Sequence, residues 1–178
     1  MVSANLRRSM TDKINIAGIV RESIVDGPGY RFCIFVQGCP HHCEGCHNPK
    51  THDFNGGKTV SVERLFEEIK KGRLLRGVTF SGGEPFCQPE ALCELARLIK
   101  TTDLDIIVYS GYTFEELLEM SCSNPKIFEL LSLCDYLIDG RFILKERSLS
   151  LRWRGSKNQR IIDLKTSLPK RTAVLADI

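Results

Sequence analysis

Three cysteines lie within eight consecutive positions, at Cys39, Cys43 and Cys46, in the segment CPHHCEGCHNP. Metal sites built wholly from protein usually have four ligands, so the C-x3-C-x2-C spacing leaves one place to be filled from elsewhere. Three arrangements meet that need. They are a structural zinc ion with His41, His42 or His47 as the fourth ligand, a closed iron–sulfur centre completed by Cys87, and a 4Fe-4S cluster whose fourth iron takes an outside ligand.

The gaps between the cysteines argue against zinc. Structural zinc sites tend to use paired C-x2-C knuckles, whereas here one three-residue gap and one two-residue gap share a single loop, and the sequence has no second pair. The spacing therefore weakens the zinc hypothesis and leaves the two iron–sulfur arrangements open.

Length and composition bound the class of protein. The 178 residues carry a formal net charge of +3, with 42% hydrophobic and 26% charged residues, which suits a single globular domain over residues 1–178. We expect residues 1–12 to form a flexible N-terminal extension. No apolar run approaches the roughly 20 residues of a membrane helix, and the scattered Lys and Arg residues do not predict nucleic-acid binding. Because no signal peptide is recognisable, the eight cysteines indicate reduced thiols in the cytoplasm rather than a disulfide framework.

Strands and helices alternate along the chain. Strands rich in β-branched and aromatic residues are predicted at 14–20, 30–36, 77–80, 105–110, 135–139 and 160–164. Helices with capping residues and apolar faces are predicted at 61–71, 89–100, 114–120 and 125–133. This alternation predicts parallel strand pairing and an α/β fold.

Glycine-containing loops follow four of the predicted strands. They are QGC at 37–39, SGGEP at 81–85, SGY at 110–112 and DGRF at 139–142. In parallel α/β proteins the carboxyl ends of the strands converge on one edge, which is where ligands bind. Glycine lets the backbone approach a ligand closely. The pattern therefore predicts one ligand bound across several strands at this edge.

The cysteine triple after an early strand, with SGGEP after the next, resembles the radical S-adenosylmethionine superfamily. The resemblance implies a small, incomplete (β/α) barrel with one 4Fe-4S cluster per chain. The amino and carboxylate groups of S-adenosylmethionine would chelate the fourth iron, as expected of a catalytic metal with an open position. The implied cluster ligands are Cys39, Cys43 and Cys46. The implied cofactor contacts are Gly45, Cys46, His47, Gly82, Gly83, Glu84 and Ser110, with no catalytic residue beyond these ligands.

Two positions depart from the pattern that this resemblance implies. The superfamily often has an aromatic residue where this chain has Gly45, immediately before the last cysteine. A subgroup of activating proteins within this superfamily, which the chain also resembles, often has Tyr where this chain has His47, immediately after that cysteine. An imidazole can stack much as a phenol ring does, so we expect the role of His47 to survive.

The segments DGPGYRF, SGGEP, YSGY, DGRF and RGSKNQ together resemble the activating proteins of anaerobic (class III) ribonucleoside-triphosphate reductases. The resemblance implies a radical S-adenosylmethionine oxidoreductase that generates a glycyl radical in the C-terminal loop of such a reductase. A low-potential donor such as flavodoxin or ferredoxin would supply the electron. Two alternatives stay open: an activase of another glycyl radical enzyme of the pyruvate formate-lyase type, and a non-enzymatic iron–sulfur or zinc-binding module for electron transfer or interaction.

The remaining thiols and imidazoles in the sequence have simpler interpretations. His41 and His42 are expected to be exposed loop residues. The cysteines outside the triple are expected to be small core residues, namely Cys33, Cys87, Cys93, Cys122 and Cys134.

Overall fold

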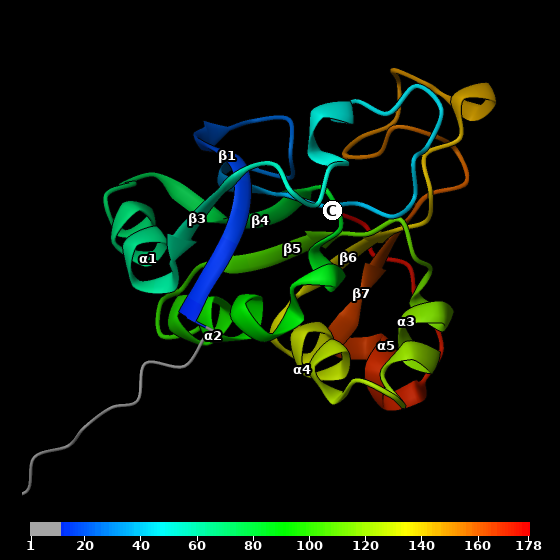
Figure 1. The fold of residues 1–178 in the computed structure, drawn as a ribbon. Coiled ribbons are helices and arrows are strands. Elements are labelled where there is room, and N and C mark those ends of the chain that lie inside the picture. The colour runs from blue at the N-terminus through cyan, green and yellow to red at the C-terminus, as the bar shows by residue number, and fades with distance from the viewer. Residues whose placement is uncertain (1–11) are drawn as a thin grey trace, which may run out of the picture.

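The computed structural model describes residues 12–178, so the predicted N-terminal extension lies outside the described residues except for its last position. The described chain forms a seven-stranded sheet in the order β3-β1-β2-β4-β5-β6-β7 (Figure 1). Its strands are β1 (Lys13–Ser23), β2 (Tyr30–Val36), β3 (Lys58–Ser61), β4 (Leu75–Gly82), β5 (Asp105–Tyr109), β6 (Tyr136–Asp139) and β7 (Arg160–Asp163).

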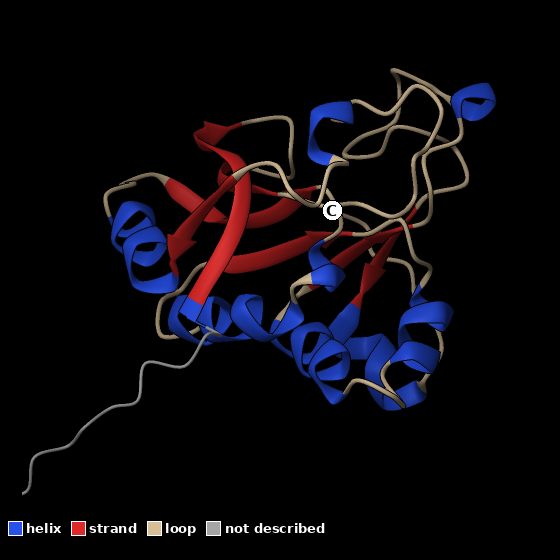
Figure 2. Cartoon of the chain, in the orientation of Figure 1, coloured by secondary structure: helices blue, strands red, loops and turns tan. Residues whose placement is uncertain are grey.

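Within residues 12–178, five α-helices lie on one side of this sheet, and the long loops gather at one end of its strands (Figure 2). The helices are α1 (Val62–Lys70), α2 (Pro89–Ile99), α3 (Phe114–Met120), α4 (Pro125–Leu133) and α5 (Leu164–Lys170). Short 3-10 turns occur at η2 (Pro49–Thr51), η3 (Pro85–Cys87) and η4 (Leu144–Glu146). Every predicted strand and helix is present, and the structure adds β3 and α5.

The predicted parallel pairing holds for the centre of the sheet and is wrong for its outer strands. Strands β2, β4, β5 and β6 are parallel neighbours, whereas β1 runs antiparallel to both β2 and β3 and β7 runs antiparallel to β6. The turn after β1 contains DGPG and is too short for a crossover connection, so it can only join an antiparallel pair. The result is a mixed α/β sheet whose parallel centre fits an incomplete (β/α) barrel.

Side chains alternate between two apolar layers along the central strands. In β5, Ile106 and Val108 face the main core between sheet and helices, while Ile107 packs in a smaller cluster with Ile138 and Ile161. Alternation of this kind is the pleat of a strand that is buried on both faces. Trp153 and the C-terminal Ala176 and Ile178 pack on the smaller cluster.

Local sequence explains where the helices begin. Ser61 caps α1 by accepting a hydrogen bond from Arg64 N, and Thr113 forms a capping box with Glu116 at α3. The helices carry the chain back across the sheet, so the parallel strands all begin at the same end. The loops that follow these strands therefore meet at the opposite end. No helix among residues 12–178 is long and apolar enough to cross a bilayer.

Candidate cluster and cofactor site

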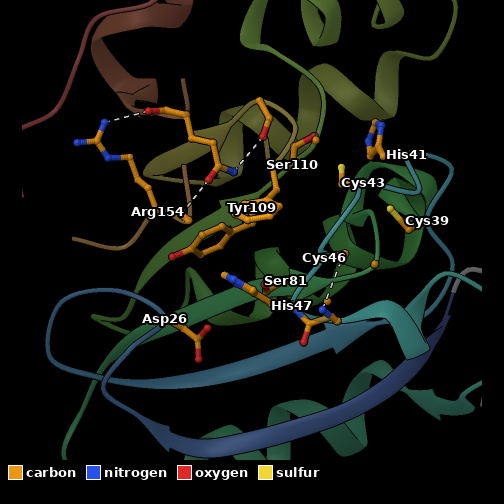
Figure 3. A pocket seen from close by; sticks show the side chains of 18 of the residues that line it. Asp26, Cys39, His41, Cys43, Cys46, His47, Ser81, Tyr109, Ser110 and Arg154 are labelled. Atoms are coloured by element: carbon orange, nitrogen blue, oxygen red, sulfur yellow. Dashed lines mark hydrogen bonds between the residues drawn. The ribbon is translucent and has the colours of Figure 1, made fainter. Parts of the chain in front are cut away.

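A cavity of about 380 Å³ opens where the strand-end loops meet (Figure 3). Seven of the nine residues that the sequence singles out line it: Cys39, Cys43, Cys46, His47, Gly82, Gly83 and Ser110. The other two, Gly45 and Glu84, lie next to lining residues but are not part of the wall. The cavity therefore joins the cysteine loop after β2 to the glycine loops after β4, β5 and β6.

Backbone hydrogen bonds fix the two ends of the cysteine loop. Gly38 N donates to Thr51 O at 2.8 Å and Cys39 N donates to His52 O at 3.2 Å. Near the other end, the backbone N–H of Asn48 points at Cys46 Sγ from 3.3 Å. Backbone N–H groups donate to cysteine sulfurs in the same way around iron–sulfur clusters.

Burial favours the protonated thiol at Cys39. It raises the pKa of the Cys39 thiol, with a smaller contribution from the negative charge of Glu84. A thiol of this kind loses its proton when a metal cation binds, because the cation supplies the compensating charge. Three thiols around one cavity, one of them already receiving a backbone N–H, fit the protein side of a 4Fe-4S cluster.

The two closed alternatives fit the described residues poorly. A Cys3His zinc site would require one imidazole beside the three thiols, and the rings of His47 and His42 contact other aromatic rings. The ring centroids of His47 and Phe142 are 5.0 Å apart, and those of His42 and His52 are 5.1 Å apart. Cys87 is exposed at the end of η3 and does not line the cavity.

Gly45 has a conformational role in the cysteine loop. Its φ is +71°, in the left-handed region that favours glycine, and a Cβ there would lie 2.9 Å from Leu144 Cδ1. An aromatic side chain at this position, as the superfamily often has, would therefore be strained and crowded here. The chain turns tightly at Gly45 to bring Cys46 to the cavity.

The glycine pair of SGGEP is packed against protein backbone. Gly83 N donates to Val36 O and Glu84 N donates to Gly38 O, each at 2.8 Å. A Cβ on Gly83 would overlap Gly38 O, and one on Gly82, whose φ is +96°, would lie 2.6 Å from Phe35 Cα. The pair therefore lets the loop after β4 lie directly on the start of the cysteine loop, in addition to lining the cavity.

Two expectations about histidine and cysteine exposure are corrected. His42 is exposed, as expected, but the His41 side chain is only 4% exposed because its ring turns inward to Glu84. Cys87 and Cys122 are exposed rather than buried, since each lies in a turn at the end of a helical segment. The remaining three are buried, as expected: Cys33, Cys93 and Cys134.

The RGSKNQ segment builds one wall of the cavity. Gln159 Oε1 accepts from Gly155 N at 2.9 Å and Ser156 N at 3.1 Å, while Gln159 Nε2 donates to Gly140 O at 3.0 Å. One side chain thus ties this segment to the DGRF loop. Sequence reasoning found the segment and gave it no role; the amide of Gln159 supplies one.

Sequence reasoning also missed part of the lining. Asp26 and Tyr109 line the cavity away from the cysteines (Figure 3), and Trp153 also lines it. Tyr109 Oη donates to Trp153 O at 2.7 Å, and burial raises the pKa of this phenol. Trp153 has φ +59°, which is uncommon for a bulky residue and marks a backbone held by its surroundings.

The DGPGYR segment supports that side of the cavity through Arg31. This side chain is fully buried; its Nη1 lies 2.6 Å from Asp105 Oδ1, and it donates to Thr79 Oγ1 and Val78 O, each at 2.7 Å. Thr79 Oγ1 in turn donates to Asp26 O at 2.8 Å. Arg31 therefore joins β2, β4 and β5 to the hairpin that carries Asp26.

The sheet, the cysteine loop and the glycine loops define an iron–sulfur protein of the radical S-adenosylmethionine type. A family model described as "4Fe-4S single cluster domain" matches residues 25–162. The chain is 36% identical over 144 residues to the anaerobic ribonucleoside-triphosphate reductase-activating protein of Vibrio cholerae, covering 76% of this chain and 89% of that one. It is 34% identical over 145 residues to the protein of that name from Escherichia coli K12 (76% and 90%). With the one from Enterobacteria phage T4, identity is also 34%, over 147 residues (77% and 86%). The chain belongs to this family of activating proteins.

Proposed function

We propose that this protein cleaves S-adenosylmethionine reductively at its 4Fe-4S cluster and generates the glycyl radical of an anaerobic ribonucleoside-triphosphate reductase. The observation that carries the proposal is the convergence of the three cysteines and the SGGEP loop on one cavity, in a chain whose relatives bear that name. A non-enzymatic electron carrier would not need a cavity walled by four strand-end loops.

The cysteine loop and the loop after β4 have separate tasks in this proposal. Cys39, Cys43 and Cys46 would hold the cluster, and S-adenosylmethionine would bind it through its amino and carboxylate groups. The cluster, when bound, supplies the electron that breaks a carbon–sulfur bond of the sulfonium. The backbone of Gly82 and Gly83 lies open to the cavity and suits the methionine amino group, with His47 and Ser110 further along the wall.

The proposed reaction consumes one electron and transfers one hydrogen atom. S-adenosylmethionine plus an electron gives methionine and a 5′-deoxyadenosyl radical. That radical takes a hydrogen atom from a glycine Cα of the reductase, giving 5′-deoxyadenosine and a glycyl radical. We propose a flavodoxin or a ferredoxin as the source of the electron.

The decisive experiment uses the full chain reconstituted with iron and sulfide under anaerobic conditions. It should carry about four irons and four sulfides per chain and, with a low-potential reductant, convert S-adenosylmethionine to methionine and 5′-deoxyadenosine. Mixed with anaerobic ribonucleotide reductase, it should produce a glycyl radical signal in electron paramagnetic resonance. A reductase whose loop glycine is changed to Ala is the control. Stoichiometric zinc without iron would overturn the proposal, and a radical on pyruvate formate-lyase but not on the reductase would reassign the partner.

A further inference from the structure

His41 lies between the first two cysteines of the triple, and its environment differs from that of its neighbours. His42 and Glu44 are exposed, whereas the His41 side chain is 4% exposed and its Nε2 lies 2.7 Å from Glu84 Oε2. Glu84 itself is fully buried. A buried imidazole–carboxylate contact beside two exposed loop residues calls for a physical explanation.

Glu84 accepts hydrogen bonds from its own loop after β4 and from the loop after β5. Its Oε1 accepts from Phe86 N at 3.1 Å and Ser110 Oγ at 3.0 Å. Its Oε2 accepts from Gly111 N at 2.9 Å, beside His41. A buried carboxylate needs such donors to offset its desolvation. A carboxylate can only accept hydrogen bonds, so His41 donates to it through Nε2–H. Glu84 thus ties the loops after β4 and β5 together, and His41 adds the cysteine loop after β2.

The shape of the neighbouring loop holds the His41 ring in place. A Cβ on Gly111 would lie 2.6 Å from His41 Nε2 and closer still to the ring carbon, so only glycine leaves room for the imidazole. On another side, the edge of the Tyr112 ring meets His41 at a centroid distance of 4.4 Å. The SGY segment therefore accommodates the imidazole and contacts it directly.

We propose that His41 is a positioning residue that latches the cysteine loop onto Glu84 and so fixes where Cys39 and Cys43 present their sulfur atoms. The inference rests on the proposed function for the purpose of the loop, while the latch itself rests on the contacts of His41. A four-iron cluster needs its three thiolates at set positions at once. A loop that is already anchored meets this need at a lower cost in conformational entropy.

Three variants separate the hydrogen bond from the ring. His41→Gln keeps an N–H donor near the position of Nε2, His41→Phe keeps a ring without the donor, and His42→Phe changes the exposed neighbour as a matched control. A hydrogen bond to a charged group contributes enough that its loss should raise the local opening of residues 39–47 by roughly 10- to 100-fold. Amide hydrogen exchange on the cluster-free full chain measures this opening directly.

We expect faster exchange over residues 39–47 in His41→Phe, and exchange close to wild type in His41→Gln and His42→Phe. After reconstitution, His41→Phe should lose iron to a chelator at least about tenfold faster than wild type, by the same energetic argument. The electron paramagnetic resonance spectrum of its reduced cluster should also change less on addition of S-adenosylmethionine. Unchanged exchange in His41→Phe would overturn the latch, as would a His41→Gln variant that behaves like His41→Phe.

Gly111→Ala gives an independent route to the same result. Gly111 has no left-handed φ, so the added methyl group acts through space alone, by displacing His41. We expect it to loosen residues 39–47 as His41→Phe does. In the double variant with His41→Ala the methyl group should add nothing further, which a double-mutant cycle measures; additive effects would overturn the latch. A chain that takes up no iron would refute the proposed function. The latch could still be tested, because hydrogen exchange is measured on the cluster-free chain.

Discussion

Arg31→Met gives a quantitative test of how the cavity is supported. We expect it to lower the free energy of unfolding by about 3–5 kcal/mol, chiefly because two buried acceptors lose their donor. Thr79 Oγ1 and Val78 O each lose a bond of 2.7 Å, and a buried acceptor left unsatisfied costs about 1–3 kcal/mol. Asp105 adds less, because its side chain is 24% exposed and keeps Arg76 Nε at 3.5 Å.

The assay for this variant is urea and thermal unfolding of the cluster-free chain in reductant, followed by circular dichroism. For a domain of this size each kcal/mol lowers the melting temperature by about 2–4 °C, so Arg31→Met should lower it by roughly 6–20 °C. Arg21→Met is the matched control: Arg21 lies 2.8 Å from Glu68 but is 63% exposed, and exposed pairs contribute little. A loss in Arg31→Met no greater than in Arg21→Met would refute the reasoning.

Three further predictions concern the cysteine triple, the loop after β4 and an ion pair at the start of α3. Iron content should fall to background when Ala replaces any residue of the triple, and should be retained in Cys87→Ala, measured by iron and sulfide analysis after reconstitution. The residues of the triple are Cys39, Cys43 and Cys46. Gly83→Val should destabilise the cluster-free chain itself in urea unfolding, because a Cβ would overlap Gly38 O; wild-type stability would contradict this. Arg160 holds the pKa of Glu115 below its usual value, so the stability from this pair is present above about pH 4.3 and lost as the pH falls through the lower folded-state pKa. Unfolding midpoints between pH 3 and 6 should therefore fall less steeply in Glu115→Gln than in wild type.

Most of the fold was predictable because local sequence encodes it. The central strands are runs of β-branched and aromatic residues, and the helices carry caps such as Ser61 and Thr113. The structure added β3, which has four residues, none of them fully buried, and α5, which contains Pro169 and has seven residues. Neither is long enough to show a clear period, and α5 has no capping box of the kind that marks the equally short α3. The antiparallel direction of β7 depends on the course of the long loop before it, which no local pattern specifies.

The candidate site divides in the same way. The cysteine spacing and the strand-end glycines are local features, so the sequence pointed to seven residues that now line one cavity. The burial of His41 depends on Glu84, which is 43 residues away in the chain. Arg31 likewise depends on groups of β4, Val78 and Thr79, that are 47 and 48 residues away. The residue type does not show whether a charged side chain is buried or exposed, so only the contacts in the folded protein distinguish the two cases.

The glycines at the rim could leave space for a ligand or allow close packing within the protein, and close packing is the stricter requirement. We expected these residues to leave space for a ligand, yet at Gly82, Gly83 and Gly111 an added Cβ would first collide with the protein itself: with Phe35, with Gly38 and with His41. At Gly83 the loop after β4 therefore lies directly on the backbone of Gly38, and at Gly111 the loop after β5 lies directly against the His41 ring. Close backbone contact of this kind leaves little freedom for the cysteine loop to rearrange. It follows that the rim is preformed, and that a substitution at these glycines tests the assembly of the site before it tests ligand binding.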